Sequence, residues 1–168
     1  MARRTLRKSD NDKPYRVGRS RTGLGLFATA AIAKGDFIID YKGRRIGHAQ
    51  AQRLEARGAR YVFEIDSRWS IDGSSRRNLM RYANHSCRPN AESALANGKI
   101  IILRAIKNIA SGDEITYDYG EEYFELFIKP VGCKCAKCAN EPRKIRLKPA
   151  RTRRSSAQRS GDARSGRP

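Results

Sequence analysis

Three short polar runs in the second half of the chain constrain its fold more than any other feature. The first is RYANHSCRPN, residues 81–90, and the second is EITYDY, residues 114–119. The third is the cysteine triplet CKCAKC, residues 133–138. The three runs together, in this order and within residues 81–138, are hard to obtain by chance. They therefore point to one particular kind of domain.

The order and the residue identities of these runs resemble the signature of SET-domain protein lysine methyltransferases. Residues 81–90 follow the family pattern R-[FY]-x-N-H-S-C-x-P-N, and residues 114–119 resemble its E-[LI]-T-[YF]-D-Y block. The cysteine triplet resembles the family's post-SET zinc motif. The resemblance covers residues 15–140 and implies a SET-domain β-clip fold with a pseudoknot. The short length and the lack of accessory domains look like those of small stand-alone bacterial or viral members.

The apolar pattern and the frequent glycines independently predict a mostly-β domain with short helices. Strands are expected around a glycine turn within residues 16–29, and at residues 36–41, 61–66 and 99–104. Gly47 to Arg57 is expected to form a helix with Gly58 at its C′ position, and residues 109–114 a turn. The resemblance adds that the segment after Glu114 threads under a loop near Asn84. The periodicity alone does not predict this crossing, because such crossings are rare.

The positive charge of the chain is concentrated at its two ends. Of the formal net charge of +19, residues 1–22 hold eight Lys or Arg against two Asp, and residues 143–168 hold ten against one. From Pro142 onward Arg, Ser, Ala, Gly and Pro dominate, which predicts a disordered basic tail. The predicted division is a basic N-terminal arm, a SET domain, a post-SET zinc-binding segment and a disordered tail, at residues 1–14, 15–126, 127–141 and 142–168.

The sequence predicts a protein of the cytosol or nucleus. Its N-terminus has no apolar stretch of signal-peptide length, and no segment approaches the roughly 20 apolar residues of a membrane span. The expected location is the cytoplasm, with nucleoid association if the protein is bacterial. A nuclear or chromatin location is expected if it is eukaryotic or host-directed. In such a reducing compartment the cysteines are expected to be metal ligands rather than disulfides.

The chemistry of lysine methylation indicates which side chains the site needs. A neutral amine must attack the methyl carbon of S-adenosylmethionine, whereas free lysine has a pKa of about 10.4. An apolar aromatic channel beside the positive sulfonium disfavours the ammonium form, so aromatic walls and hydroxyl groups are expected. A charged carboxylate would favour the ammonium, and the transfer needs no metal.

The resemblance assigns this channel to Tyr119, Tyr117, Tyr41 and Phe63. It implies that Tyr119 is the catalytic tyrosine, whose hydroxyl orients the amine and the transferring methyl group. Tyr117 falls at the position that is Phe or Tyr in the family and tunes the number of methyl groups added. A Tyr there favours mono- or dimethylation over trimethylation. For Tyr41 and Phe63, plain core packing is the alternative interpretation.

The resemblance also implies a binding site for S-adenosylmethionine. Its members would be Gly23, Leu24, Gly25, Tyr61, Arg81, Asn84, His85 and Tyr123. The two glycines would let the chain lie against the methionine portion, although a lone G-x-G is also typical of a simple turn. The backbone of Asn84 and His85 would contact the adenine, and Asn84 would also fix the loop. Tyr123 would pack on the adenine, whereas Leu24 replaces a frequent aromatic residue.

The resemblance further implies a structural zinc site of Cys87, Cys133, Cys135 and Cys138. Four thiolates form a closed tetrahedral site that leaves no position for substrate. The metal would tie the post-SET segment to residue 87 and cover the cofactor and the lysine channel. The spacing C-x-C-x2-C is tighter than the usual C-x-C-x4-C of the family. Free thiols and an iron–sulfur cluster are the alternatives.

The sequence therefore predicts an S-adenosylmethionine-dependent protein lysine N-methyltransferase. The expected substrates are histones or another basic or nucleic-acid-associated protein, such as a nucleoid or ribosomal protein. A nucleic-acid-associated zinc protein with a SET scaffold is one alternative, because the basic ends favour nonspecific phosphate contacts. A catalytically inactive SET module that binds peptides is another, against which the intact Tyr119, Asn84 and His85 argue.

Overall fold

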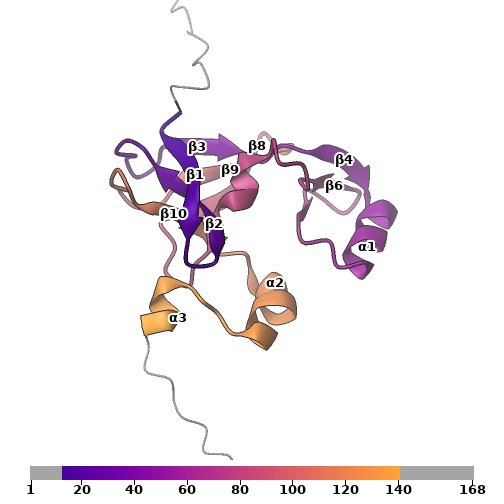
Figure 1. Cartoon of the computed structure of the whole chain (residues 1–168). Helices are drawn as coiled ribbons and strands as arrows, with labels where there is room; N and C mark the ends of the chain where they lie inside the picture. The colour runs from indigo at the N-terminus through magenta and orange to yellow at the C-terminus, as the bar shows by residue number, and fades with distance from the viewer. Residues whose placement is uncertain (1–12, 141–168) are drawn as a thin grey trace, which may run out of the picture.

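Three small β-sheets form the framework of the computed structural model, which describes residues 13–140 (Figure 1). Short helical segments connect and flank them, so the expectation of mostly strands with short helices is confirmed. Within the described residues, no helix is both long and apolar enough to cross a membrane. The predictions for residues 1–12 and for the tail from residue 142 onward lie outside the described residues.

The first sheet carries the residues of the second motif and part of the first. Its strand order is β1 (Tyr15–Ser20), β2 (Gly23–Ala28), β10 (Glu114–Tyr117) and β7 (Asn84–His85). β1 and β2 are antiparallel and form the predicted pair around a glycine turn. β10 is antiparallel to β2 but parallel to β7, with Thr116 opposite Asn84 and Tyr117 opposite His85.

β10 passes between β2 and the segment of residues 84–90. On the side away from β2, the Asn90 amide group accepts a hydrogen bond from the Thr116 N–H and donates one to the Glu114 carbonyl oxygen, both 2.9 Å long. The Ser86 N–H donates to the Tyr117 carbonyl oxygen. This is the threading that the family resemblance implied.

The second and third sheets have three strands each. The second has the order β3 (Phe37–Asp40), β9 (Ile100–Ala105) and β8 (Ala91–Ala96), and the third the order β4 (Arg44–Gly47), β6 (Trp69–Asp72) and β5 (Val62–Glu64). β3, β5 and β9 lie where strands were predicted. The β8–β9 hairpin was missed, although its turn contains Asn97 and Gly98, both with positive φ. Asn-Gly is a strong hairpin signal.

The predicted helix is present as α1 (His48–Ala56), beside the third sheet (Figure 1). It ends in a Schellman turn: the N–H of Gly58 donates to the Glu55 carbonyl oxygen, and that of Ala59 to the Leu54 carbonyl oxygen. The remaining segments are short: η2 (Leu79–Tyr82), α2 (Glu121–Tyr123), the π-helical η3 (Phe124–Ile128), η4 (Lys129–Val131) and α3 (Ala136–Asn140).

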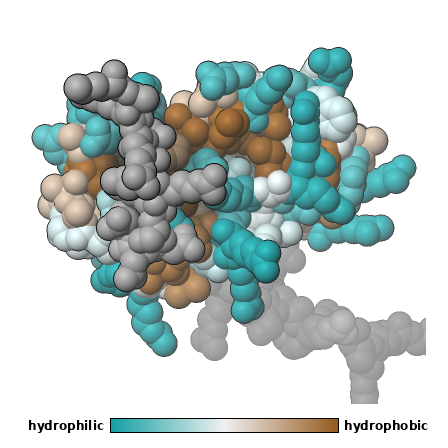
Figure 2. Space-filling view, turned by 90° about the horizontal axis from the view of Figure 1, so that it is seen from above, coloured by the Kyte–Doolittle hydropathy of each residue, from teal (hydrophilic) through white to brown (hydrophobic). Residues whose placement is uncertain are grey.

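The hydrophobic core lies between the first two sheets and supports the site. Leu26 of β2, Leu103 of β9 and Ile115 of β10 are fully buried. Successive strand residues point to opposite faces, so Tyr117 lies on the same face of β10 as Ile115 and belongs to the core cluster. Seen from above, hydrophobic residues gather in the middle of the surface with hydrophilic side chains around them (Figure 2).

Candidate active site and metal centre

A cavity of about 770 Å³ lies where α1, β5 and the segment from Tyr117 to Phe127 meet. Its aromatic lining is Tyr41, Tyr61, Phe63, Tyr117, Tyr119, Tyr123 and Phe127. The structure thus brings together all of the residues predicted for the lysine channel. It adds to them three of the residues predicted for cofactor binding, Tyr61, Arg81 and Tyr123.

Tyr119 lies just beyond the end of β10, at the wall of this cavity. Its hydroxyl donates a hydrogen bond to the Ala83 carbonyl oxygen at 2.8 Å. Its ring packs edge-on against Tyr123 and tilted against Tyr117, with centroids 5.0 Å and 4.8 Å away. Burial raises the pKa of Tyr119, and neighbouring tyrosines add to that effect. The hydroxyl therefore stays protonated near neutral pH and can orient a ligand by hydrogen bonding, but it is not a base.

Tyr117 is, with Tyr41, one of the two buried tyrosines that line the cavity. It is 9% exposed and lies in the core cluster. Burial raises its pKa well above the ordinary tyrosine value, and the nearby Tyr119 and Tyr41 contribute further. Its hydroxyl is therefore also neutral, and its ring packs against that of Tyr119.

Tyr41 and Phe63 also line the cavity and pack against each other, with ring centroids 5.4 Å apart. The Tyr41 hydroxyl donates to the Tyr61 carbonyl oxygen at 2.9 Å. Gly73 leaves room for this ring, because a Cβ there would lie 2.3 Å from the nearest Tyr41 ring atom. Tyr41 belongs both to the core and to the cavity lining, so the two interpretations of this residue hold together.

Arg81 closes one edge of the cavity. Its guanidinium lies over the Tyr61 ring, 3.9 Å from the centroid, and donates to the Ser74 carbonyl oxygen. Its Nε atom is buried and has no hydrogen-bond partner among the described residues. The guanidinium is thus held at the cavity lining by the Tyr61 ring and the Ser74 carbonyl oxygen.

The glycine loop and Asn84 lie outside the lining of this cavity. The Asn84 amide nitrogen donates to Ser20 Oγ, the Leu24 carbonyl oxygen and Glu114 Oε1, at 3.0, 3.0 and 2.7 Å. A Cβ on Gly25 would lie 2.5 Å from that Glu114 oxygen. Asn84 therefore fixes the loop, and Gly25 makes room for the carboxylate that Asn84 binds.

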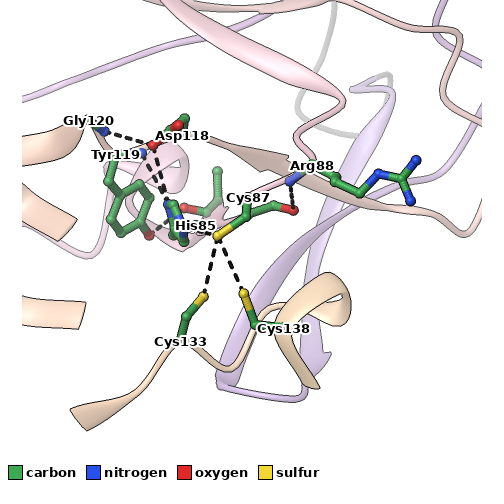
Figure 3. Close-up of polar contacts among 10 residues, drawn as sticks. His85, Cys87, Arg88, Asp118, Tyr119, Gly120, Cys133 and Cys138 are labelled. Atoms are coloured by element: carbon green, nitrogen blue, oxygen red, sulfur yellow. Dashed lines mark hydrogen bonds and ion pairs between the residues drawn. The ribbon is translucent and has the colours of Figure 1, made fainter. Parts of the chain in front are cut away.

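A smaller pocket of about 280 Å³ adjoins the main cavity, with which it shares Gly120 and Glu121. His85 and Cys87 line it. His85 Nδ1 accepts a hydrogen bond from the Tyr119 N–H, and its Nε2 lies near Cys87 Sγ, both at 3.3 Å (Figure 3). Burial lowers the pKa of His85, and the Asp118 carboxylate opposes that shift.

The four cysteines form one cluster, in which every Sγ atom lies within 4.8 Å of the others. Cys87 Sγ lies 3.8 Å from Cys133 Sγ and 3.6 Å from Cys138 Sγ (Figure 3). Tetrahedral zinc with Zn–S bonds of about 2.3 Å requires sulfur separations of about 3.8 Å. The donor set and its spacing therefore fit zinc.

The tight C-x-C-x2-C spacing is accommodated by α3. Cys135 immediately precedes this helix, and the Ala139 N–H donates to the Cys135 carbonyl oxygen. Cys138 therefore lies one helical turn beyond Cys135 and on the same side.

Hydrogen bonding prepares Cys135 to act as a thiolate. Burial alone would raise its pKa, but hydrogen bonds from the backbone of Cys138 and Cys87 outweigh burial and lower the pKa to about 6. Burial is the largest cause that raises the pKa of Cys138 to about 11. One sulfur is thus available as a thiolate near neutral pH, the form that binds metal.

Sequence reasoning missed part of the cavity lining. Four exposed carboxylates line it, on Glu55, Glu64, Glu121 and Glu122. The position of the last two, directly after the Tyr119-Gly120 pair, is a signal that could have found them. His48, predicted to be a solvated surface residue, is exposed on α1 and lies at the cavity edge.

Comparison with known sequences matches the profile described as SET domain to residues 23–120. The "Histone-lysine N-methyltransferase, H3 lysine-4 specific" of Neurospora crassa is 34% identical over 137 residues, 76% of this chain and 10% of that protein. "Histone-lysine N-methyltransferase set1" of Dictyostelium discoideum is 37% identical over 68% of this chain and 8% of that protein. The chain thus spans a tenth or less of the length of these relatives.

The chain also superposes on solved structures at more than 30% sequence identity. The polycomb repressive complex 2 of Chaetomium thermophilum contains a chain that superposes with a TM-score of 0.58 at 32% identity, over 65% of this chain and 15% of that one. A structure described as "ctPRC2 in an autoinhibited conformation bound to S-adenosylmethionine" superposes with the same TM-score and identity, over 64% of this chain and 15% of that one.

Proposed function

The chain belongs to the SET-domain family, and we propose that it is a protein lysine N-methyltransferase that uses S-adenosylmethionine. The observation that carries the proposal is the aromatic cavity that is lined both by the packed rings of Tyr119 and Tyr117 and by those of Tyr41 and Phe63. An aromatic channel with neutral hydroxyl groups is what a lysine side chain needs to become an uncharged nucleophile. The names of the related methyltransferases support the same activity.

S-adenosylmethionine would supply the electrophilic methyl group. The Tyr119 hydroxyl would orient the amine for in-line attack, and the apolar rings would exclude water. The lysine ammonium would give up its proton to solvent as it enters the channel, because desolvation there disfavours the charged form. The carboxylates at the cavity lining are exposed, so they lie in solvent rather than against the reacting nitrogen.

The proposed cofactor site spans the two pockets. Tyr61, Arg81 and Tyr123 would contact the cofactor from the main cavity, and the backbone of His85 would contact it from the smaller pocket, with that of Asn84 beside it in the chain. The loop of residues 23–25 would lie against its methionine portion. The related structure whose description names bound S-adenosylmethionine supports this assignment.

Zinc would have a structural role in the proposed enzyme. Cys87 follows β7, whereas Cys133, Cys135 and Cys138 lie in the C-terminal segment. A metal held by all four would fix this segment against the residues that form the smaller pocket. The four sulfurs fill the tetrahedral set, so no coordination position remains for substrate.

The proposed substrate is a lysine in a basic segment of a protein. Four glutamates line the cavity against two arginines, Arg60 and Arg81, so the lining carries a net negative charge that attracts such a segment. Histones and other nucleic-acid-associated proteins, such as nucleoid or ribosomal proteins, are the substrates of this chemistry. Chromatin or the nucleoid is accordingly the proposed location.

The proposal is tested by incubating the protein and isotopically labelled S-adenosylmethionine with core histones in one reaction and with a cell lysate in another. Mass spectrometry should locate the label on lysine side chains. A Tyr119→Phe protein supplies the background. Label on no protein, with folding verified by circular dichroism, would favour an inactive SET module that binds peptides.

A further inference from the structure

The His85 imidazole lies between the cysteine cluster and the proposed catalytic tyrosine. Its side chain is 7% exposed, with Nε2 3.3 Å from Cys87 Sγ and Nδ1 3.3 Å from the Tyr119 backbone nitrogen (Figure 3). The rings of Tyr119 and Phe124 hold the imidazole from two sides, with centroids 5.5 and 5.4 Å away. The proposed cofactor contact of this residue uses its backbone, so its side chain is free for another role.

The hydrogen bond from Tyr119 determines where the imidazole proton lies. A backbone N–H can only donate, so Nδ1 must present its lone pair, and the ring proton lies on Nε2. Nε2 then points this proton at Cys87 Sγ. The Asp118 carboxylate would favour a proton on Nδ1, but its Oδ1 is 3.6 Å away and already accepts a hydrogen bond from the Gly120 N–H. The Asp118 side chain is also 62% exposed, so water weakens its effect. The closer, better-oriented Tyr119 N–H therefore decides the tautomer.

We propose that His85 is a positioning residue that donates its Nε2–H to the metal-binding sulfur of Cys87 while it holds the backbone of Tyr119. This inference rests on the zinc site of the proposed function. Four thiolates around Zn²⁺ carry a net charge of about −2, and an N–H donor to one of them spreads that charge. Hydrogen bonds of this kind orient a ligand and strengthen metal binding, and their loss typically lowers metal affinity by about 10- to 100-fold.

The proposal connects two sites that are otherwise separate. Zinc fixes the Cys87 sulfur, the sulfur orients the imidazole, and the imidazole orients the main chain at Tyr119. His85 thus acts on the reaction through Tyr119 and touches none of the reacting atoms. Loss of zinc should therefore disturb the tyrosine through this path, in addition to freeing the C-terminal segment.

Two substitutions separate the two hydrogen bonds. In His85→Asn, the amide reaches the position of Nδ1 and can accept from Tyr119 N–H, but it is too short to reach Cys87. In His85→Gln, the longer amide reaches the position of Nε2 and can donate to Cys87 Sγ, but it leaves the Tyr119 N–H without an acceptor. His48→Gln, on an exposed histidine remote from the cysteines, is the matched control for metal affinity.

Zinc affinity is measured by competition with a chelator, and cobalt in place of zinc reports the sulfur-to-metal charge-transfer band. We expect His85→Asn to bind zinc about 10- to 100-fold more weakly and to shift the cobalt band to lower energy, because the sulfur lone pairs lose their donor. The zinc affinity of His85→Gln should lie within about threefold of that of the wild type and of His48→Gln. His85→Gln should nevertheless have a lower kcat than His85→Asn, because its Tyr119 N–H has no acceptor. The KM for S-adenosylmethionine should be unchanged.

Equal zinc affinity and an unmoved cobalt band in both His85 variants would overturn the proposal. An equal loss of affinity in both would also overturn it, since that result describes a general packing role. The metal measurements do not depend on methyl transfer. A wild type that binds zinc but transfers no methyl group would therefore contradict the proposed function alone, whereas one that binds no zinc would contradict this inference.

Discussion

The Tyr119 hydroxyl donates a 2.8 Å hydrogen bond to the carbonyl oxygen of Ala83, the residue directly before Asn84. Two of the three sequence motifs thus meet at one polar contact inside an aromatic cavity. The contact fixes the ring in place, because Tyr117 and Tyr123 pack against it from the other sides. A hydroxyl held in this way needs little reorganisation when a substrate amine enters.

The first prediction concerns Tyr119→Phe, which keeps the ring and removes the hydroxyl. We expect methyl transfer to fall by at least about 100-fold, because the amine loses its orienting group. Binding of S-adenosylmethionine, measured by calorimetry, should remain nearly unchanged. Loss of the Ala83 hydrogen bond should lower the free energy of unfolding by about 1 kcal/mol. Tyr82→Phe, outside the cavity lining, is the control; a Tyr119→Phe enzyme as fast as this control would refute the assignment.

The second prediction concerns the number of methyl groups. Tyr117→Phe removes the hydroxyl of a buried ring that packs against Tyr119 and lines the cavity. The added room should shift the product toward higher methylation states of the same lysine. Intact-mass spectrometry of a methylated peptide over time measures the distribution. If Tyr117→Phe and the wild type give the same distribution, Tyr117 does not control the methylation state.

The third prediction is that purified protein contains about one zinc ion per chain. Elemental analysis should show this ion and its loss in Cys135→Ser, which removes the buried sulfur of the cluster. Zinc binds thiolates, so protons compete with it, and occupancy should fall as the pH falls. Lys137→Ser, on the same helix but without a ligand atom, should keep its zinc. Metal-free protein with full activity would contradict the structural role.

The fourth prediction is a loss of stability in alkaline solution. Burial raises the pKa of Tyr41, Tyr117 and Tyr119 in the folded protein above the ordinary tyrosine value. These groups keep their protons when tyrosines of the unfolded chain ionise, so their contribution is complete below pH of about 10 and is lost as the pH rises beyond it. Denaturant titrations between neutral and alkaline pH measure this effect.

Tyr117→Phe supplies the control for the alkaline experiment, since lysines and arginines titrate equally in both proteins. The variant should lose less stability than the wild type above pH of about 10, because it has one fewer raised pKa. Parallel curves for the two proteins would show that the Tyr117 hydroxyl ionises normally.

The fifth prediction concerns residues 143–168, which lie outside the described residues and carry ten Lys or Arg against one Asp. Their removal should weaken binding to DNA in low salt and reduce the salt dependence of binding, because fewer phosphates are neutralised. Methylation of a short peptide should stay nearly unchanged, since all proposed site residues precede this segment. Unchanged DNA affinity would show that the charge serves another purpose, and lost peptide activity that the segment assists the active site.

The local features of the fold could be predicted from the sequence, whereas the long-range pairings could not. Gly58 marked the end of α1, and the alternation in residues 61–66 marked β5, because both signals lie within a few residues. The parallel pairing of Thr116 with Asn84 has no local signal. It came only from the family resemblance, which specifies topology that periodicity cannot.

The same division holds for the candidate site. Motif positions predicted Tyr119 and the cysteines, and the structure brings each group together. The acidic lining was missed because Glu55 lies on α1 and Glu64 on β5, and only the folded chain places them around one cavity. The role of α3 in the cysteine spacing was missed because a five-residue helix has too little sequence to show a period.

The position of β10 between β2 and the segment of residues 84–90 has a consequence for how the protein is made. The strand must insert into a gap whose two sides come from distant parts of the chain, and nonlocal closure of this kind is slow. We therefore expect the contacts of Tyr117 and of the following Tyr119 to form among the last in folding. A partly folded chain with the β1–β2 and β8–β9 hairpins should still be inert, so newly synthesised protein should gain the proposed activity later than it gains secondary structure.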